Sequence, residues 1–317
     1  KNLDDLQGGN RSLLVTGEDQ KEDPLDFVLW KPKKEGEPFW EAPWCDGRPG
    51  WHIECSVMSK KYLGDEIDIH AGGEDLVFPH HENEIAQSEA ANERPFSRYW
   101  MHNAFLNIDN RKMSKSVGNF FTVRDIGKRY DLQVFRFFML SAHYRSPLNF
   151  SAELMEAAAN GYDRIVTSVS NLNYLIRNVS GGEDGAEISG REEELLKEAE
   201  GFARKFDEAM EDDFNTADAI AVIFELVKIA NTNASSASGI GFLKALKDEI
   251  VTLSDICGLI VDKKEEILDS EIEALIDERQ AARKEKNFKR ADEIRNQLLE
   301  RGIVLEDTRE GVKWKRA

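Results

Sequence analysis

The stretch Ile67-Asp-Ile-His-Ala-Gly-Gly-Glu-Asp-Leu-Val-Phe-Pro-His-His-Glu-Asn-Glu84 has the features of a strand, a turn and the start of a helix. Its first four residues form a short apolar run typical of a strand, and the Gly72-Gly73 pair favours a turn. Pro79 suits the first position of a helix, because its fixed φ is helical and its missing N–H is not needed there. This order of elements predicts an α/β domain.

The same stretch contains candidate metal ligands. A helix that starts near His80 places His80 and Glu84 four residues apart, on the same face. Cys55 could supply a third ligand, and thiolate, imidazole and carboxylate all suit zinc. An ordinary polar helix start with a buried cysteine explains the same residues, so both interpretations remain open. A metalloprotease HExxH motif is excluded, because Ile85 stands where its second histidine would be.

Two further groups indicate nucleotide chemistry. Gly72 and Gly73 would let the backbone approach a ligand closely, and Asp75 could accept hydrogen bonds from ribose hydroxyls, although a plain turn also fits. Lys112 and Lys115 stand three residues apart in a stretch with serines and a glycine. Such a cationic loop suits a polyphosphate, because it stabilises the charge that develops on departing pyrophosphate.

The 317 residues, 36.0 kDa in mass, are enough for two or three domains. Residues 1–147 are rich in Trp, Gly, Pro and His, which predicts the loops and strands of an α/β domain. Residues 148–262 have helical apolar spacing and predict an all-α bundle. Residues 263–317 combine a charged helix with a hairpin, and predict a small mixed α/β domain.

Within the bundle region, Asn215 or Thr216 is a suitable N-cap for a helix, and Cys257 is expected to pack as a small apolar residue. In the last region, the sequence predicts one charged helix over residues 276–299 and a hairpin over residues 303–314, with a turn at Gly311. Apolar residues recur at three- and four-residue steps in the bundle at Ala219, Ile223, Leu226 and Ala230.

The charge pattern limits the possible partners. A formal net charge of -18, from 60 acidic and 42 basic side chains, argues against a generic basic nucleic-acid binder. RNA contacted through a local basic face remains compatible, because residues 279–317 hold 12 basic and 7 acidic side chains. Residues 183–213 hold 13 acidic and 4 basic side chains, which solvated helix faces explain.

The sequence also indicates a cellular setting. No apolar run approaches the ~20 residues that a membrane-spanning helix needs. Three cysteines cannot form a disulfide framework in a chain of this size, which favours a reducing, cytoplasmic setting. No targeting segment is visible at the start. Because Lys1 is not a methionine, the chain is expected to begin inside a longer protein.

Several motifs resemble one family. Lys112-Met-Ser-Lys-Ser116 is the KMSKS signature of class I aminoacyl-tRNA synthetases, and the text around it is similar to cysteinyl-tRNA synthetases in particular. The resemblance covers essentially the whole chain. The similar segments are residues 50–55, 71–84, 119–125, 141–150, 212–216, 291–295 and 302–307.

The resemblance implies the second half of a Rossmann-like catalytic domain, then a tRNA-binding helical bundle and an anticodon-binding domain. It implies ATP-dependent activation of cysteine to cysteinyl-adenylate, followed by transfer to tRNA(Cys). One active-site zinc ion per chain, on Cys55, His80 and Glu84, would take the cysteine side chain as a thiolate. A serine hydroxyl offers no such bond, so no editing domain is needed.

The resemblance also assigns roles to individual positions. Trp51 and His70 match positions that close around the bound amino acid. Gly72, Gly73 and Asp75 match the strand end that holds adenosine.

Charged residues elsewhere in the chain match positions that bind the triphosphate of ATP or the tRNA. Lys112 and Lys115 match the loop that steadies the triphosphate, with Mg²⁺ on the phosphates. Arg283, Asp292 and Asp307 match positions where the anticodon domain meets bases. The residues expected to contact phosphates are Lys284, Lys286, Lys289, Arg290 and Arg295.

One departure from the family concerns the start of the sequence. These synthetases begin with a half-fold that carries a HIGH-type motif for ATP and another zinc-binding cysteine, and neither is present here. The chain alone is therefore expected not to adenylate cysteine, whereas a longer polypeptide that contains it should. The partners expected of that polypeptide are tRNA(Cys), ATP and L-cysteine, and it is expected to be a monomer without a membrane contact.

Two alternatives remain. The cysteine-adenylating ligase of mycothiol synthesis shares the catalytic core but lacks the anticodon tail, so residues 263–317 argue against it. A truncated paralogue that holds tRNA or zinc without catalysis would also fit, because the HIGH-bearing half is absent from the sequence.

Overall fold

The computed structural model describes residues 21–23, 25–113, 121–178, 187–262, 268–300, 303–308 and 311–316. By its internal contacts the chain divides into two compact units, Lys1–Val261 and Asp262–Ala317. The described part is mostly helical, with four small sheets. No helix among the described residues is both long and apolar enough to cross a bilayer.

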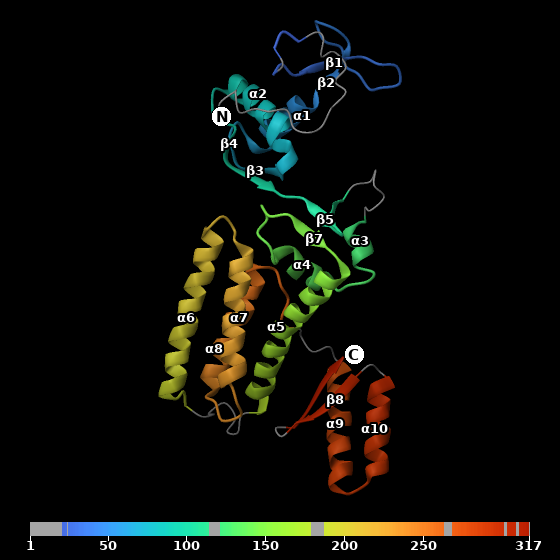
Figure 1. Ribbon diagram of the computed structural model, residues 1–317, viewed down its shortest axis with the longest axis vertical. Helices are drawn as coiled ribbons and strands as arrows, with labels where there is room; N and C mark the ends of the chain where they lie inside the picture. The colour runs from blue at the N-terminus through green and yellow to red at the C-terminus, as the bar shows by residue number, and fades with distance from the viewer. Residues whose placement is uncertain are drawn as a thin grey trace. The chain divides into compact units, whose positions relative to one another are not determined.

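The first unit begins with an α/β region that holds the stretch quoted above (Figure 1). Strand β3 (Ile67–Gly73) pairs in parallel with β4 (Ser97–Asn103), and helix α2 (Glu82–Asn92) connects them. Parallel strands need such a crossover, because a tight turn can join only antiparallel neighbours. Helix α1 (Trp51–Leu63) packs beside α2. The strands before it, β1 (Trp30–Pro32) and β2 (Gly47–Pro49), form an antiparallel pair.

A second small sheet follows, with the strand order β6-β5-β7. Its central strand β5 (Leu106–Ile108) pairs antiparallel with β6 (Arg111–Lys112) and parallel with β7 (Leu148–Phe150). Helices α3 (Val123–Ile126) and α4 (Leu132–Leu140) lie between β6 and β7 in the chain. The paired strands therefore bring together backbone segments that are about forty residues apart in the sequence.

Four long helices form the bundle, and they lie alongside one another in Figure 1. They are α5 (Ala152–Asn178), α6 (Gly190–Glu211), α7 (Thr216–Asn233) and α8 (Ile240–Ile256). Of the two predicted N-caps of α7, Asn215 is the cap, because its side chain accepts a hydrogen bond from the Asp218 backbone N–H, and Thr216 is the first residue of the helix. At α6, Ser189 and Glu192 form a reciprocal capping box.

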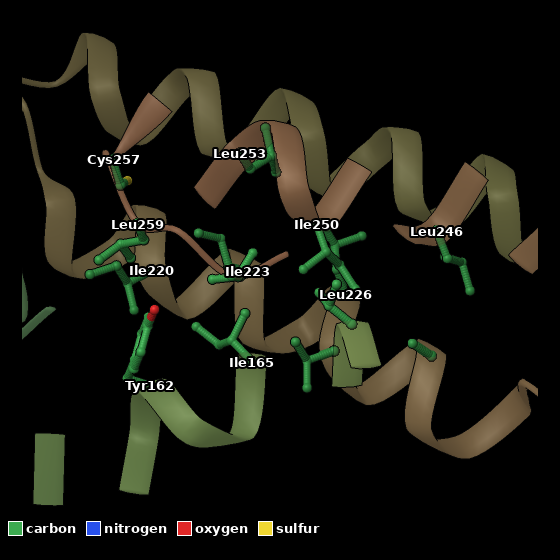
Figure 2. Close-up of a cluster of buried hydrophobic side chains, with 14 of the residues drawn as sticks. Tyr162, Ile165, Ile220, Ile223, Leu226, Leu246, Ile250, Leu253, Cys257 and Leu259 are labelled. Atoms are coloured by element: carbon green, nitrogen blue, oxygen red, sulfur yellow. The ribbon is translucent and has the colours of Figure 1, made fainter. Parts of the chain in front are cut away.

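The bundle core is continuous and apolar. Five fully buried residues from three helices belong to this one core, and Figure 2 shows them: Ile165, Ile223, Leu226, Leu246 and Ile250. The predicted periodic positions of α7 are buried, and Cys257 packs in this core at 4% exposure. The core also takes three apolar side chains from α4, which precedes the bundle in the chain: Val134, Phe137 and Phe138.

The second unit differs in one respect from the sequence prediction. Residues 276–299 do not form a single helix, because α9 (Leu268–Lys284) ends and α10 (Phe288–Glu300) begins within them. Lys286 adopts a left-handed φ of 58° at the break, and Asn287 caps the next helix by accepting from the Arg290 N–H. A left-handed residue ends a helix because its carbonyl no longer points along the axis.

The predicted hairpin is present. Strands β8 (Ile303–Thr308) and β9 (Gly311–Arg316) pair antiparallel from Ile303↔Arg316 to Thr308↔Gly311. The sequence Arg301-Gly302 is typical of a helix stop, but these two residues lie outside the described part of the chain. Five residues form the unit's own apolar core: Ile272, Ile276, Ile294, Leu298 and Ile303.

The turn after α8 gives a test of the bundle's packing. Gly258 has a φ of +66°, and an added Cβ would lie 2.7 Å from the Arg136 guanidinium, whose Nε donates to the Cys257 carbonyl. We expect Gly258→Ala to destabilise the bundle by about 1–2 kcal/mol, because the left-handed conformation is unfavourable for alanine. Urea unfolding followed by circular dichroism measures this change.

Gly190→Ala is the matched control. Gly190 is at the start of α6, and an added Cβ there would meet nothing within 4 Å. The unfolding midpoint of this variant should equal or slightly exceed that of the wild type. Equal midpoints for the two alanine variants would contradict the strain assigned to Gly258.

Candidate functional site

The candidate ligands His80 and Glu84 lie on one helical face, as their spacing predicts. The chain turns into the helix at Phe78, which has an extended conformation, and α2 itself begins at Glu82 after a wider turn over Val77–His81. The helix thus starts two residues later than predicted, but the wide turn keeps His80 in line with Glu84. His80 Nε2 lies 2.9 Å from Glu84 Oε1.

Cys55 completes the group from the neighbouring helix α1. Its Sγ, a ring nitrogen of His80 and a carboxylate oxygen of Glu84 lie within 4.8 Å of one another. His80 and Glu84 are buried, and Cys55 is half-buried. One sulfur, one nitrogen and one oxygen donor in this arrangement could hold a metal ion, and zinc accepts all three.

Glu84 lies at the centre of this group. Its side chain is 1% exposed, and neither carboxylate oxygen has a well-directed hydrogen bond. Instead, the oxygens lie 2.9 Å from the Nε2 atoms of His70 and His80. A buried carboxylate with unsatisfied lone pairs is costly, and a bound cation would remove that cost. The donor set therefore fits a metal ion.

The protonation states also suit metal binding. Burial alone would raise the pKa of Glu84, but His70 and His80 outweigh it and the pKa is lowered. Burial lowers the pKa of His80, so its imidazole stays neutral at neutral pH. An ionised carboxylate and a neutral imidazole both have a lone pair for a cation.

The pKa of Cys55 shifts in the opposite direction. Burial, followed by the charge of Glu84, raises it to about 11. Without a cation, the side chain is therefore a protonated thiol at neutral pH. Only the thiolate is a strong metal ligand, so metal binding at this centre must release that proton.

Three further histidines surround the ligands, and sequence reasoning did not assign them a role. His52 Nδ1 lies 2.7 Å from His80 Nδ1, and His81 Nδ1 lies 2.8 Å from His102 Nε2. Burial, with the neighbouring histidine rings next, lowers the pKa of His52 and of His81 to about 4. His70, His81 and Glu84 form a second group with metal-ligand spacing. The sequence signal that could have identified these three histidines was the high histidine content of this region.

The other predicted residues of the region lie around this centre. Trp51 stacks on His80 with ring centroids 4.2 Å apart, and its side chain is 55% exposed. Gly72, in β3, lies against His81, where an added Cβ would be 2.8 Å from the ring. Gly73 ends β3, and an added Cβ there would be 2.6 Å from Asp75 Oδ1, on an exposed side chain.

The remaining predicted residues are farther along the chain. Lys112 is in β6, whereas Lys115 and Ser116 lie outside the described residues. In the second unit, Arg283 is exposed near the end of α9 and Asp292 is exposed in α10. Asp307 is in β8.

Three family models match successive parts of the chain. Residues 1–160 match the tRNA synthetases class I (C) catalytic domain, and residues 205–261 match the DALR domain. Residues 266–314 match the cysteinyl-tRNA ligase anticodon binding domain. The three models follow one another along the chain in the same order as the α/β region, the bundle and the second unit.

The chain is also similar to complete curated proteins. It is 67% identical to the cysteine–tRNA ligase of Lachnospira eligens and 60% identical to that of Lachnoclostridium phytofermentans. Both alignments cover 100% of this chain and 67% of the relative. The chain thus spans about two thirds of the length of these relatives.

Among solved structures, the leucyl-tRNA synthetase of Agrobacterium radiobacter, in a ternary complex with tRNA and LeuAMS, matches with a TM-score of 0.52. The match covers 74% of this chain and 37% of that one, at 16% identity. This likeness supports the fold alone.

The raised pKa of Cys55 gives a test. In metal-free protein at pH 8, we expect iodoacetamide to modify Cys55 about two orders of magnitude more slowly than an ordinary exposed cysteine, because only the thiolate reacts. The rate should rise steeply as the pH approaches 11. Peptide mass spectrometry follows each cysteine separately, with exposed Cys45 as the internal reference. Equal rates for the two cysteines at pH 8 would contradict the assignment.

Proposed function

This chain belongs to the cysteine–tRNA ligase family of class I aminoacyl-tRNA synthetases, and we propose that Cys55, His80 and Glu84 are its cysteine-selecting centre. The observation that supports this proposal most directly is the buried Glu84 carboxylate, which lies beside a thiol and two imidazoles without a well-directed hydrogen bond. The sequence offers the same three residues as candidate ligands, and the family resemblance implies the same set.

The reaction has two steps. A carboxylate oxygen of cysteine attacks the α-phosphorus of ATP, and pyrophosphate leaves to give cysteinyl-adenylate. A hydroxyl oxygen of the terminal adenosine of tRNA(Cys) then attacks the adenylate carbonyl carbon, and AMP leaves. Positioning and electrostatic stabilisation supply most of the catalysis in such reactions.

The metal ion that selects cysteine at this centre would be zinc. Bound there, it would accept the sulfur of substrate cysteine and discriminate against serine, whose hydroxyl is a poor zinc ligand. Cys55, His80 and Glu84 would hold the ion. His70, which contacts the second oxygen of Glu84, would keep the carboxylate oriented toward it.

Two sets of residues would bind the rest of the substrate. Trp51, stacked on His80 and largely exposed, would close over the bound cysteine. Gly72 and Gly73 would hold adenosine at the end of β3, as the family resemblance implies. A side chain at either position would collide with His81 or Asp75 and shift this strand end. Asp75 would accept hydrogen bonds from the ribose hydroxyls.

The larger architecture supports the same function. Strands β3 and β4, with α2 between them, would be part of the Rossmann-like catalytic domain over residues 1–147. Residues 148–262 would be the tRNA-binding bundle, and residues 263–317 the anticodon-binding domain. Lys112 and Lys115 would steady the triphosphate, with Mg²⁺ bound to its oxygens. We propose that the protein acts as a cytoplasmic monomer.

The anticodon contacts belong to the second unit. Arg283 could donate two parallel hydrogen bonds to guanine, and Asp292 and Asp307 could accept from the exocyclic amines of bases. Arg290 is held by Glu278 at 2.8 Å and by Glu293 at 3.5 Å, so it is less available for phosphate than the other basic residues proposed for that role.

The first test concerns the metal and the activation step. We expect the natural polypeptide that carries this chain to hold about one equivalent of zinc and to catalyse cysteine-dependent pyrophosphate exchange. Cys55→Ser and His80→Ala should each lose most of the zinc, because each removes one of the few side chains that hold the ion. Elemental analysis measures the metal independently of activity.

Cys45→Ser is the matched control, because Cys45 is exposed and outside the ligand group. It should keep both the zinc and the exchange activity. Stoichiometric zinc in a Cys55→Ser/His80→Ala double variant would refute the metal assignment. A wild type that binds tRNA but shows no exchange would identify the protein as a binding module.

The second test concerns the anticodon contacts. We expect Asp307→Ala to raise the KM for tRNA(Cys) in aminoacylation about tenfold or more, since loss of one base contact costs about 1–3 kcal/mol. Pyrophosphate exchange should not change, because this step needs no anticodon. Asp277→Ala, at an exposed position of α9, is the control. Unchanged aminoacylation by Asp307→Ala would remove this residue from recognition.

A further inference from the structure

The turn between α6 and α7 has an unusual backbone. Asp213 and Phe214 are consecutive non-glycine residues, each with a φ of 55°. A left-handed conformation is tolerated by aspartate but is rare for a bulky residue such as phenylalanine. The Phe214 side chain is 49% exposed, so burial of its ring does not compensate for the strain. Strain of this kind persists where surrounding contacts fix it, and it is concentrated at functional positions.

Side-chain contacts fix this turn to the segment that follows α4. The Tyr144 hydroxyl donates to Asp213 Oδ1 at 2.8 Å, and Arg145 Nη2 lies 2.9 Å from Asp213 Oδ2. Burial and then Asp213 raise the pKa of Tyr144, so its hydroxyl remains a donor. One residue beyond the turn, the Thr216 hydroxyl donates to the Leu140 carbonyl at 2.9 Å. The two segments are thus joined at Asp213 itself and again at Thr216, two residues after Phe214.

The segment after α4 is joined in turn to the small sheet. The Ala104 N–H donates to the Tyr144 carbonyl at 2.9 Å, and the Leu148 N–H donates to the Phe105 carbonyl at 3.2 Å. From there β7 pairs with β5, and β5 pairs with β6, where Asn107 is opposite Lys112. Hydrogen bonds, linked by short stretches of backbone, therefore connect the Asp213 carboxylate with the strand that carries Lys112.

We propose that Asp213 is a positioning residue for ATP activation, which holds the β6-β5-β7 sheet, and with it Lys112, in place relative to the bundle. This inference rests on the proposed function, because Lys112 is assigned there to the triphosphate. Asp213 does not touch substrate. It acts through Tyr144 and Arg145, and a carboxylate is needed because the two contacts require two acceptor oxygens.

The experiment uses Asp213→Gly in the natural polypeptide that carries this chain. Glycine adopts a φ of 55° without strain, so the variant removes the carboxylate but keeps the backbone of the turn. We expect kcat/KM for ATP in pyrophosphate exchange to fall about 10- to 100-fold, the effect of misplacing a catalytic group by about 1 Å. The KM for cysteine and the zinc content should stay at wild-type values, and the melting temperature should stay within about 3 °C.

Two companion variants sharpen the test. Asp212→Gly changes an exposed neighbour and should match the wild type in every measurement. Tyr144→Phe removes only the hydroxyl and should lower kcat/KM for ATP less than Asp213→Gly does. Combined with Asp213→Gly it should add almost nothing, because both changes remove the same contact.

The outcomes are distinct. Wild-type kinetics for Asp213→Gly would overturn the inference, and so would a uniform loss of ATP binding, cysteine binding and thermal stability, since that is the result of a merely structural role. Fully additive effects of Asp213→Gly and Tyr144→Phe would also overturn it. A wild type without any exchange activity would overturn the proposed function, and this inference with it.

Discussion

The burial of one carboxylate determines the arrangement of the candidate centre. Glu84 is ionised and almost fully buried, and an isolated charge in that position would be strongly unfavourable. Its surroundings place a sulfur atom from α1, a nitrogen from β3 and a nitrogen from the turn before α2 close to its two oxygens. The proposed metal ligands thus come from separate elements that meet at Glu84. A centre that is pre-formed in this way loses little side-chain entropy when it binds a cation.

The surrounding histidines extend this constraint outward. With neutral rings at neutral pH, His52 and His81 add polar atoms without adding like charges beside a bound cation. Trp51 stacks on His52, and Trp100 lies tilted against His81. The centre is thus a mostly uncharged, half-enclosed environment around a single anion. In such an environment the electrostatic attraction between a ligand and a cation is much stronger than in water.

The amino-acid sequence predicts much of this molecule. Local signals were sufficient for the Asn215 cap, the buried positions of α7 and the hairpin of the second unit, because each depends on residues close together in the chain. The spacing of His80 and Glu84 likewise predicted their shared face. The break at Lys286 was missed, since a lysine carries no signal for a left-handed backbone and charged residues continue on both sides of it. The pairing of β5 with β7 and the contact of Tyr144 with Asp213 could not be predicted either, because tertiary packing brings these distant segments together.

The raised pKa of Cys55 has a consequence for the metal-free protein. A thiol that stays protonated at cellular pH is a poor target for peroxide, and it is slow to exchange with disulfides. If the proposed ion binds here, a newly made chain would keep its sulfur ligand from oxidation before binding. The burial that disfavours the thiolate would thus also protect the thiol.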